Sequence, residues 1–256
     1  KGIPDQFITA NAALSLTKNE LGRLSTRLVQ ANVKVIEYEL MKVVNFDPES
    51  PFFERINLSE RKDSSKIGYK TMVRIAKNWY AGTDDVFSHI FPNLYPDITG
   101  NTPKAKRARI TRWKTSEDWG RFFIDFWRAA FDKYSDEPSH EPGFTLWQVG
   151  HSNLIIAVVL SELQNAYFNH LNQQDEEFFS VKEGNTVEGL RAKLRKRAEK
   201  FFEYFPADFF SREWGQKSLS IGPGRETLMK TITEFVNKKG RFQYANCSLI
   251  TGNVAR

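Results

Sequence analysis

The stretch TSEDWGRFFIDFWRAAFDKY (115–134) carries the strongest helical signal in the sequence. Its large apolar residues recur at intervals of three and four: Trp119, Phe122, Phe123, Phe126, Trp127, Ala130, Phe131 and Tyr134. This spacing places them on one face of a helix, where they can pack against a core. Thr115 is a residue type that caps helix starts, and acidic residues follow it in the first turn. The pattern predicts an amphipathic helix at the centre of a helical protein.

Similar periodic patterns extend over most of the chain. They predict helices over 17–44, 67–80, 146–171, 186–205 and 225–238. Alternating patterns are few, and the best candidates for short strands are near 5–10, 52–58 and 242–250. We therefore expect residues 1–256 to form a single, mostly α, multi-helical domain with a few short strands.

The sequence DPESPFFERI (47–56) ends the first of these helices abruptly. Each of its two prolines lacks a backbone N–H and restricts the residue before it, so the helix cannot continue. Phe52 and Phe53 follow at once. We expect both rings to resume burial in a short extended segment beyond the turn.

Composition indicates a globular protein without membrane spans. Apolar residues make up 40% of the 256 residues and charged residues 27%. The most apolar run, NLIIAVVL (153–160), is much shorter than the ~20 residues that cross a bilayer. Cys247 is the one cysteine, so it has no partner for an internal disulfide, and this favours a reducing compartment. We expect a soluble, cytoplasmic protein.

Two basic clusters are the main functional signal in a chain of net charge +6. The first, KAKRARITRWK (104–114), has six cations and no acid. Three prolines and a glycine lie within 91–109, so we expect 91–114 to be a basic flexible loop. Such a loop beside Trp113 suits contact with a phosphate backbone. The candidate nucleic-acid-binding residues here are Lys104, Lys106, Arg107, Arg109, Arg112 and Lys114.

The second cluster, RAKLRKRAEK (191–200), has six cations and one acid. On a helix, Leu194 and Ala198 face inward and the cations spread over the remaining surface. A solvated basic face and a nucleic-acid contact explain this pattern equally well. Its candidate binding residues are Arg191, Arg195 and Lys196.

Signals for catalysis are weak. None of the four histidines has the spacing of a metal site, and His151-Ser152 is better explained by a capping or core histidine than by a nucleophile pair. SIGPGRETL (220–228) lacks the GK[ST] ending of a phosphate loop and predicts a turn that leads into a helix. We assign no catalytic residue, metal ligand or cofactor.

Several segments resemble a known family. FITAN…LSLTKNELGRL (7–24), YELMKVVNFDPESPFFERINL (38–58) and KIGYKTMVRIAK (66–77) resemble the second half of DGQHR-domain proteins. That group includes the DndB-like proteins of bacterial DNA phosphorothioation clusters. WGRFFIDFWRAAFDKY (119–134) is similar to a helical segment that follows the family's core, and a more distant similarity connects the chain to the N-terminal module of GmrSD-type restriction enzymes.

The resemblance covers 5–170 in scattered pieces, and DPESPFFERI is its most specific element. The DGQHR signature, which lies upstream of these segments in the family, is not in this chain, so no family active-site residue is carried over. The resemblance implies that 1–60 is the tail of an upstream ParB-like α+β core, and that 61–256 is the helical region that follows it.

Three functions follow as hypotheses. The first is a DNA-binding, non-catalytic component or regulator of a bacterial DNA-modification or phage-defence system, with DNA and other proteins of that system as partners. The second is a nuclease or NTPase subunit whose catalytic part lies upstream. The third is a protein-interaction module built on YFPADFFSREW (204–214), although we favour burial of its Phe209, Phe210 and Trp214 against the core.

Overall fold

The computed structural model describes residues 36–58, 63–80, 94–116, 118–174, 186–215, 219, 222–241, 243 and 247–251. Within these ranges the chain is mostly helical, as predicted, with one small sheet. The helices are α3 (Ile36–Phe46), α4 (Tyr69–Tyr80), α6 (Pro103–Thr115), α7 (Asp118–Tyr134), α8 (Ala157–Gln174), α9 (Val187–Glu203), α10 (Ala207–Ser211), α11 (Gly222–Asn237) and α12 (Ser248–Thr251). The strands β1 (Ile56–Asn57) and β2 (Ile67–Gly68) pair in parallel.

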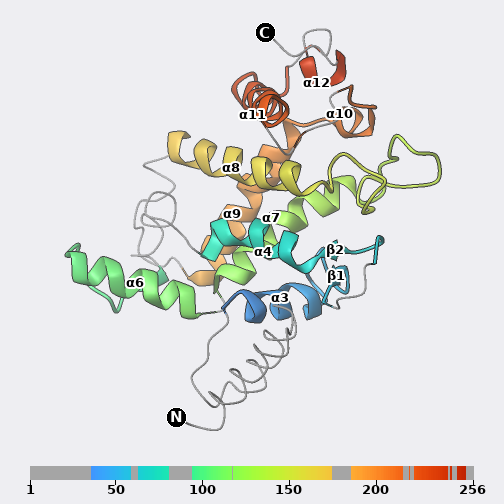
Figure 1. Cartoon of the computed structure of the whole chain (residues 1–256). Helices are drawn as coiled ribbons and strands as arrows, with labels where there is room; N and C mark the ends of the chain where they lie inside the picture. The colour runs from blue at the N-terminus through green and yellow to red at the C-terminus, as the bar shows by residue number, and fades with distance from the viewer. Residues whose placement is uncertain are drawn as a thin grey trace.

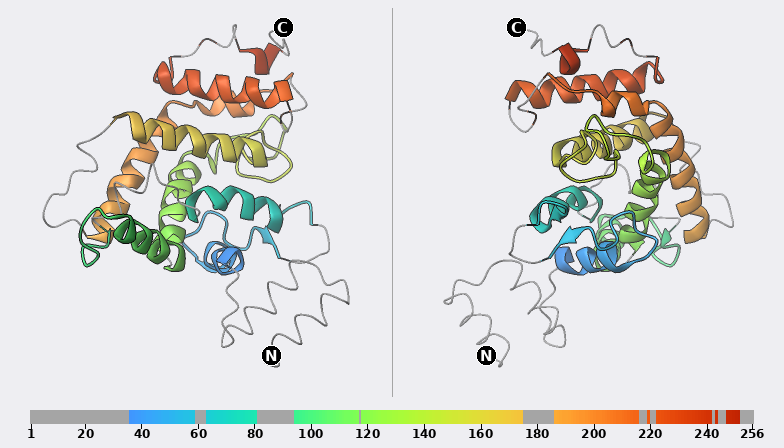
Figure 2. Two further views of the ribbon diagram at one scale, coloured as in Figure 1. Left: turned by 60° about the vertical axis from the view of Figure 1, so that its left-hand side comes forward. Right: turned by 90° about the vertical axis from the view of Figure 1, so that its right-hand side faces the viewer.

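Four helices form a stack, in the order α11, α8, α4 and α3 from top to bottom in Figure 2. Helices α7 and α9 run along the side of this stack and pack closely against each other. The strong pattern of 115–134 is thus explained, because α7 contacts α3, α4 and α9 at once. Its large rings, apart from the partly buried Phe131, fill the space between these helices.

The core is rich in aromatic rings arranged around Trp79. The Trp79 ring lies 4.9 Å from Phe168 and 5.5 Å from Phe126, measured between centroids, in tilted or edge-on geometry. Gln164 is fully buried in the same region. Its Oε1 accepts hydrogen bonds from the indole N–H groups of Trp79 and Trp127, and its amide donates to the Ile75 carbonyl at 2.9 Å. One polar side chain therefore satisfies three buried polar groups from two other helices.

The turn after α3 is organised by Asn45, whose side chain is buried. Its Oδ1 accepts from the Ile56 N–H at 2.9 Å, and its carbonyl accepts from the Glu54 N–H. The predicted return to burial is correct for Phe52, which is fully buried, and wrong for Phe53, which is 40% exposed. The chain folds back as a tight turn before the short strand β1, so adjacent rings point in opposite directions.

Three sequence-based boundaries need correction. Helix α8 begins at Ala157 rather than at 146, because Gly150 adopts a φ of +86° that a right-handed helix does not allow. The expected strand over 242–250 contains α12 at its C-terminal end. Thr115 ends α6 instead of capping α7, and the Ser116 hydroxyl accepts from the Asp118 N–H.

The other predicted helices are present where they can be compared, but α4 begins at Tyr69 because Ile67–Gly68 form β2, and α11 begins at Gly222 rather than at 225. Thr186 caps α9 by accepting from the Gly189 N–H at 3.0 Å, and α11 covers the predicted final helix. The expected helix over 17–35 and the expected strand over 5–10 lie outside the described residues. Over the ranges that the structure describes, no helix combines the length and the apolar character needed to cross a bilayer.

Candidate nucleic-acid interface

The first basic cluster forms a helix, which corrects the expectation of a flexible loop. Thr102 is the N-cap of α6 and accepts from the Ala105 N–H at 3.2 Å, and Pro103 occupies the first turn, where its missing N–H costs nothing. Residues 94–102 precede the helix and, apart from the helical residue Leu94, form an irregular segment of turns and bends. The cations of 104–114 are therefore held on a regular scaffold, on sides of the helix that differ greatly in exposure.

The inner side of α6 contains Ala105, Arg109 and Trp113 at four-residue spacing, and all three are buried. Trp113 is fully buried, donates to the Trp79 carbonyl at 2.9 Å, and packs against the Phe122 ring. Trp113 therefore does not lie beside a flexible basic loop, as the sequence suggested, and its ring is not accessible to a nucleic acid. This residue anchors α6 to the core.

Arg109 is a structural residue in this fold, contrary to prediction. It is 5% exposed, and its guanidinium donates to the carbonyls of Ile98 and Gly100. These bonds hold the irregular segment 94–102 against α6. An arginine has the forked donor geometry that two neighbouring carbonyls require.

Arg112 is paired within the chain. Its Nη1 lies 2.6 Å from a carboxylate oxygen of Asp97, and its guanidinium lies 4.7 Å from the centre of the Tyr95 ring. The Tyr95 hydroxyl donates to Asp118 at 3.0 Å, and burial raises the pKa of that hydroxyl. The guanidinium is still half exposed, but its charge is offset by the neighbouring acid.

Lys104, Lys106 and Arg107, here called the basic tip, are exposed in the first two turns of α6. None of the three has an ion-pair partner among the described residues, and the first turn contains no acid. The side chain of Lys114 is outside the described part of the structure. Figure 1 shows α6 at the edge of the molecule, with its N-terminal end directed away from the other labelled helices. Among the described side chains of the first cluster, the basic tip is thus the part best placed to meet a large anion.

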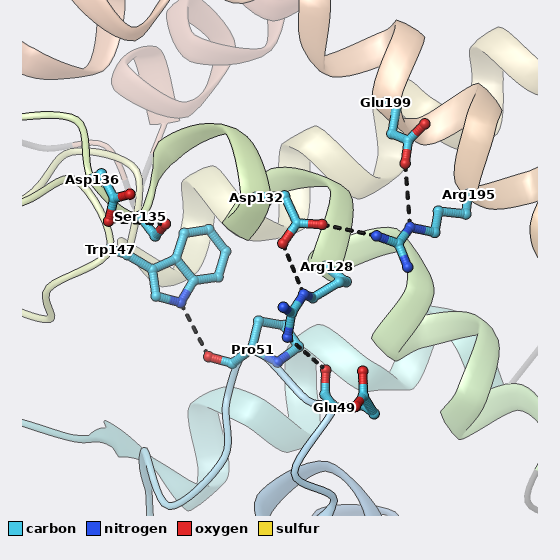
Figure 3. A network of polar contacts seen from close by, with 9 residues as sticks. All are labelled: Glu49, Pro51, Arg128, Asp132, Ser135, Asp136, Trp147, Arg195 and Glu199. Carbon is cyan, nitrogen blue, oxygen red and sulfur yellow. Dashed lines mark hydrogen bonds and ion pairs between the residues drawn. The ribbon is translucent and has the colours of Figure 1, made fainter.

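The second cluster contributes mainly to packing between α7 and α9. Arg191 binds both carboxylate oxygens of Asp125, at 2.7 and 3.1 Å. Arg195 donates to Asp132 at 2.8 Å and to Glu199 at 3.2 Å, and Asp132 also accepts from Arg128 (Figure 3). These two arginines join the helices, so their prediction as binding residues is not supported by their contacts.

The same network reaches the turn after α3. Arg128 lies near the Glu49 carbonyl, at 3.4 Å, and the Trp147 indole donates to the Pro51 carbonyl at 3.1 Å (Figure 3). Of the three candidates in the second cluster, Lys196 is exposed on α9. The second cluster therefore retains one candidate with a solvent-facing side chain.

Other possible chemical sites are explained by local structure. The His151 Nδ1 lies 2.7 Å from a carboxylate oxygen of Glu141, and its ring stacks on Phe144 with centroids 3.6 Å apart. Ser152 is buried, and its hydroxyl accepts from the Leu154 N–H, so it is not placed as a nucleophile. No group of three or more His, Cys, Asp or Glu residues within the described ranges could hold a metal ion.

The glycine-rich segment and the aromatic segment also have structural roles. Gly222 begins α11 with a φ of +45°, and Arg225 binds the buried carboxylate of Glu162 at 2.7 Å. The predicted helix is therefore confirmed, but it already includes residues 222–228, and no separate turn precedes it within the described part of this segment. Phe209, Phe210 and Trp214 are buried, as favoured over an exposed patch.

Sequence reasoning missed two features of the interface: the helix itself and the small residues on its exposed side. Ala108 and Thr111 are exposed on the same side of α6 as Lys104 and Arg107, at helical spacing. Thr102-Pro103 was a usable signal for a helix start.

No family model matches the chain, and no curated protein or solved structure matches it either.

Proposed function

We propose that this protein is a DNA-binding, non-catalytic component or regulator of a bacterial DNA-modification or phage-defence system that acts in the cytoplasm. The observation that carries the DNA-binding part is the basic tip. It consists of three exposed cations on a helix that extends from the edge of the molecule, without acidic partners among the described residues. The assignment to a modification or defence system comes from the resemblance to DGQHR-domain proteins.

The electrostatics of α6 favour a polyanion. Cations in the first turn of a helix lie next to its partial positive charge and are normally unfavourable there. Lys104 and Lys106 both occupy this turn. A bound phosphate backbone offsets this repulsion, because phosphates are attracted both to the cations and to the helix end. Binding would therefore relieve a local repulsion.

The arrangement of the braced arginines supports the same function. Arg109 and Arg112 hold the segment 94–102 against α6, and Trp113 fixes the helix to the core. The basic tip is therefore presented by a rigid support. A rigid support reduces the conformational entropy that a loop would lose on binding.

Fluorescence anisotropy with a labelled DNA duplex tests the proposal. We expect binding that weakens steeply between about 50 and 200 mM salt, because neutralised phosphates release counterions. A duplex that does not bind, or binding that is independent of salt, would contradict the proposed function.

A further inference from the structure

The solvent-facing side of α6 has a composition that discriminates between kinds of nucleic acid. We define its outer face as Lys104, Arg107, Ala108 and Thr111, which are exposed and occupy positions i, i+3, i+4 and i+7 on one side of the helix. Two long cations near the helix start are followed by two small side chains. The two small residues therefore allow the helix to approach a partner closely, and the two cations lie on the same face nearer the helix start.

The outer face does not provide a stacking platform. Proteins that bind single strands without sequence preference rely on exposed aromatic rings against which bases stack. The rings of α6 and the preceding described segment are those of Tyr95 and Trp113, which are 2% and 0% exposed. Both point into the protein, where they contact Asp118 and Trp79. A single-stranded partner would find charge here but no ring.

The dimensions of α6 suit the major groove of a DNA duplex. A helix is about 10–12 Å across with its side chains, and the major groove of B-form DNA is about 12 Å wide. The 13 residues of α6 span about 20 Å at ~1.5 Å per residue. The major groove of duplex RNA is deep and narrow and does not admit a helix in this way.

We propose that the outer face of α6 enters the major groove of duplex DNA. Lys104 and Arg107 reach base edges or the near phosphates, Lys106 contacts the flanking backbone, and Ala108 and Thr111 allow close approach. This inference rests on the proposed function and adds the class of nucleic acid and the groove. It requires no movement of the buried Arg109 and Trp113.

Competition binding with three labelled probes of one length tests the class of nucleic acid. Duplex DNA, duplex RNA and single-stranded DNA are compared with the full chain at one salt concentration. We expect duplex DNA to bind at least about tenfold more tightly than the other two. Equal or tighter binding of RNA or of the single strand would overturn this inference and leave polyanion binding intact, whereas no binding of any probe would overturn both proposals.

Dimethyl sulfate footprinting tests the groove, because this reagent methylates guanine N7 in the major groove and adenine N3 in the minor groove. We expect protection of guanine N7 in the bound duplex and no change at adenine N3. Protection at N3 alone, or no protection in a fully bound sample, would overturn the proposal.

A variant of α6 separates groove entry from simple charge. Ala108→Phe adds bulk to the outer face without changing charge, and we expect at least about tenfold weaker duplex binding and loss of N7 protection. Thr233→Phe, at an exposed position of α11, is the matched control and should bind as the wild type does. Unchanged binding by Ala108→Phe would contradict close approach of this face to DNA.

Discussion

Gln164 shows how much one buried side chain can organise. Its amide satisfies the indole N–H groups of Trp79 and Trp127 and the carbonyl of Ile75. Gln164→Leu would preserve much of the volume and leave these groups without partners in a dry interior. We expect it to reduce the free energy of unfolding by about 3–5 kcal/mol, because each stranded polar group costs about 1–3 kcal/mol.

Urea unfolding followed by tryptophan fluorescence measures this change. Asn169→Leu, at an exposed position of the same helix, is the control and should shift the free energy of unfolding by less than about 0.5 kcal/mol. A loss for Gln164→Leu as small as that of the control would show that the three bonds are not important for stability.

His170 gives the fold a defined response to acid. Burial lowers the pKa of its imidazole, and the nearby Arg197, Lys200 and Lys239 lower it further. Because the folded-state pKa is below the unfolded value of about 6.5, the unfolded chain takes up the proton more readily. The stability contribution is fully present above pH 6.5 and is lost as the pH falls below it.

Replacing this histidine should remove part of that response. We expect His170→Gln to lose less unfolding free energy than the wild type between pH 7.5 and pH 5.5. Urea unfolding at the two pH values provides the measurement. An identical decrease in both proteins would show that His170 does not contribute.

At the scale of elements, α6 and the preceding segment form a braced unit whose stability depends on Arg109. Arg109→Ala leaves the Ile98 and Gly100 carbonyls without their charged donor. We expect a loss of about 2–3 kcal/mol, since hydrogen bonds to charged groups contribute more than neutral ones. Arg107→Ala, two residues away and exposed, should leave stability within about 0.5 kcal/mol.

Thermal and urea unfolding of the two variants separate the structural arginine from the surface one. Hydrogen exchange of the amides in 94–102 shows whether the loss is local to that segment. Equal stability of the two variants would contradict the bracing role of Arg109.

The contact between α7 and α9 depends on the pair formed by Arg191 and Asp125. Arg191→Met leaves a carboxylate that is 13% exposed without its partner, and we expect a cost of about 2–3 kcal/mol. The double variant Arg191→Met, Asp125→Leu should regain part of this loss, because it removes the stranded charge. DNA binding by Arg191→Met should equal that of the wild type. A large loss of binding at normal stability would show that Arg191 contacts DNA.

The helices that the sequence predicts well are those with a clear apolar stripe, such as α7 and α9. Helix α6 escaped prediction because its buried face is Ala105, Arg109 and Trp113, in which a cation occupies a core position. The ion-pair partners of the basic residues could not be predicted from the sequence either. Arg191 and Asp125 are 66 residues apart, so only the folded chain shows that they meet.

At the scale of the molecule, described cations of the two basic clusters lie in two different settings. Those of the α7–α9 contact, together with Arg109 and Arg112, stabilise the structure, while the basic tip is left at the edge. The net charge of +6 therefore overstates the charge available to a partner, since many cations are engaged within the chain. The distribution of unengaged charge is the better guide to binding.

The salt dependence of duplex DNA binding tests the central claim most directly. The variant Lys104→Ala, Lys106→Ala, Arg107→Ala removes the basic tip, and the control variant Lys230→Ala, Lys238→Ala, Arg241→Ala removes the same charge from α11 and the turn after it. We predict that the slope of log K against log salt falls by about 3 in magnitude for the tip variant, since each lost phosphate contact changes it by about 1. The control should retain the wild-type slope, and equal slopes for the two variants would contradict the claim that the basic tip binds DNA.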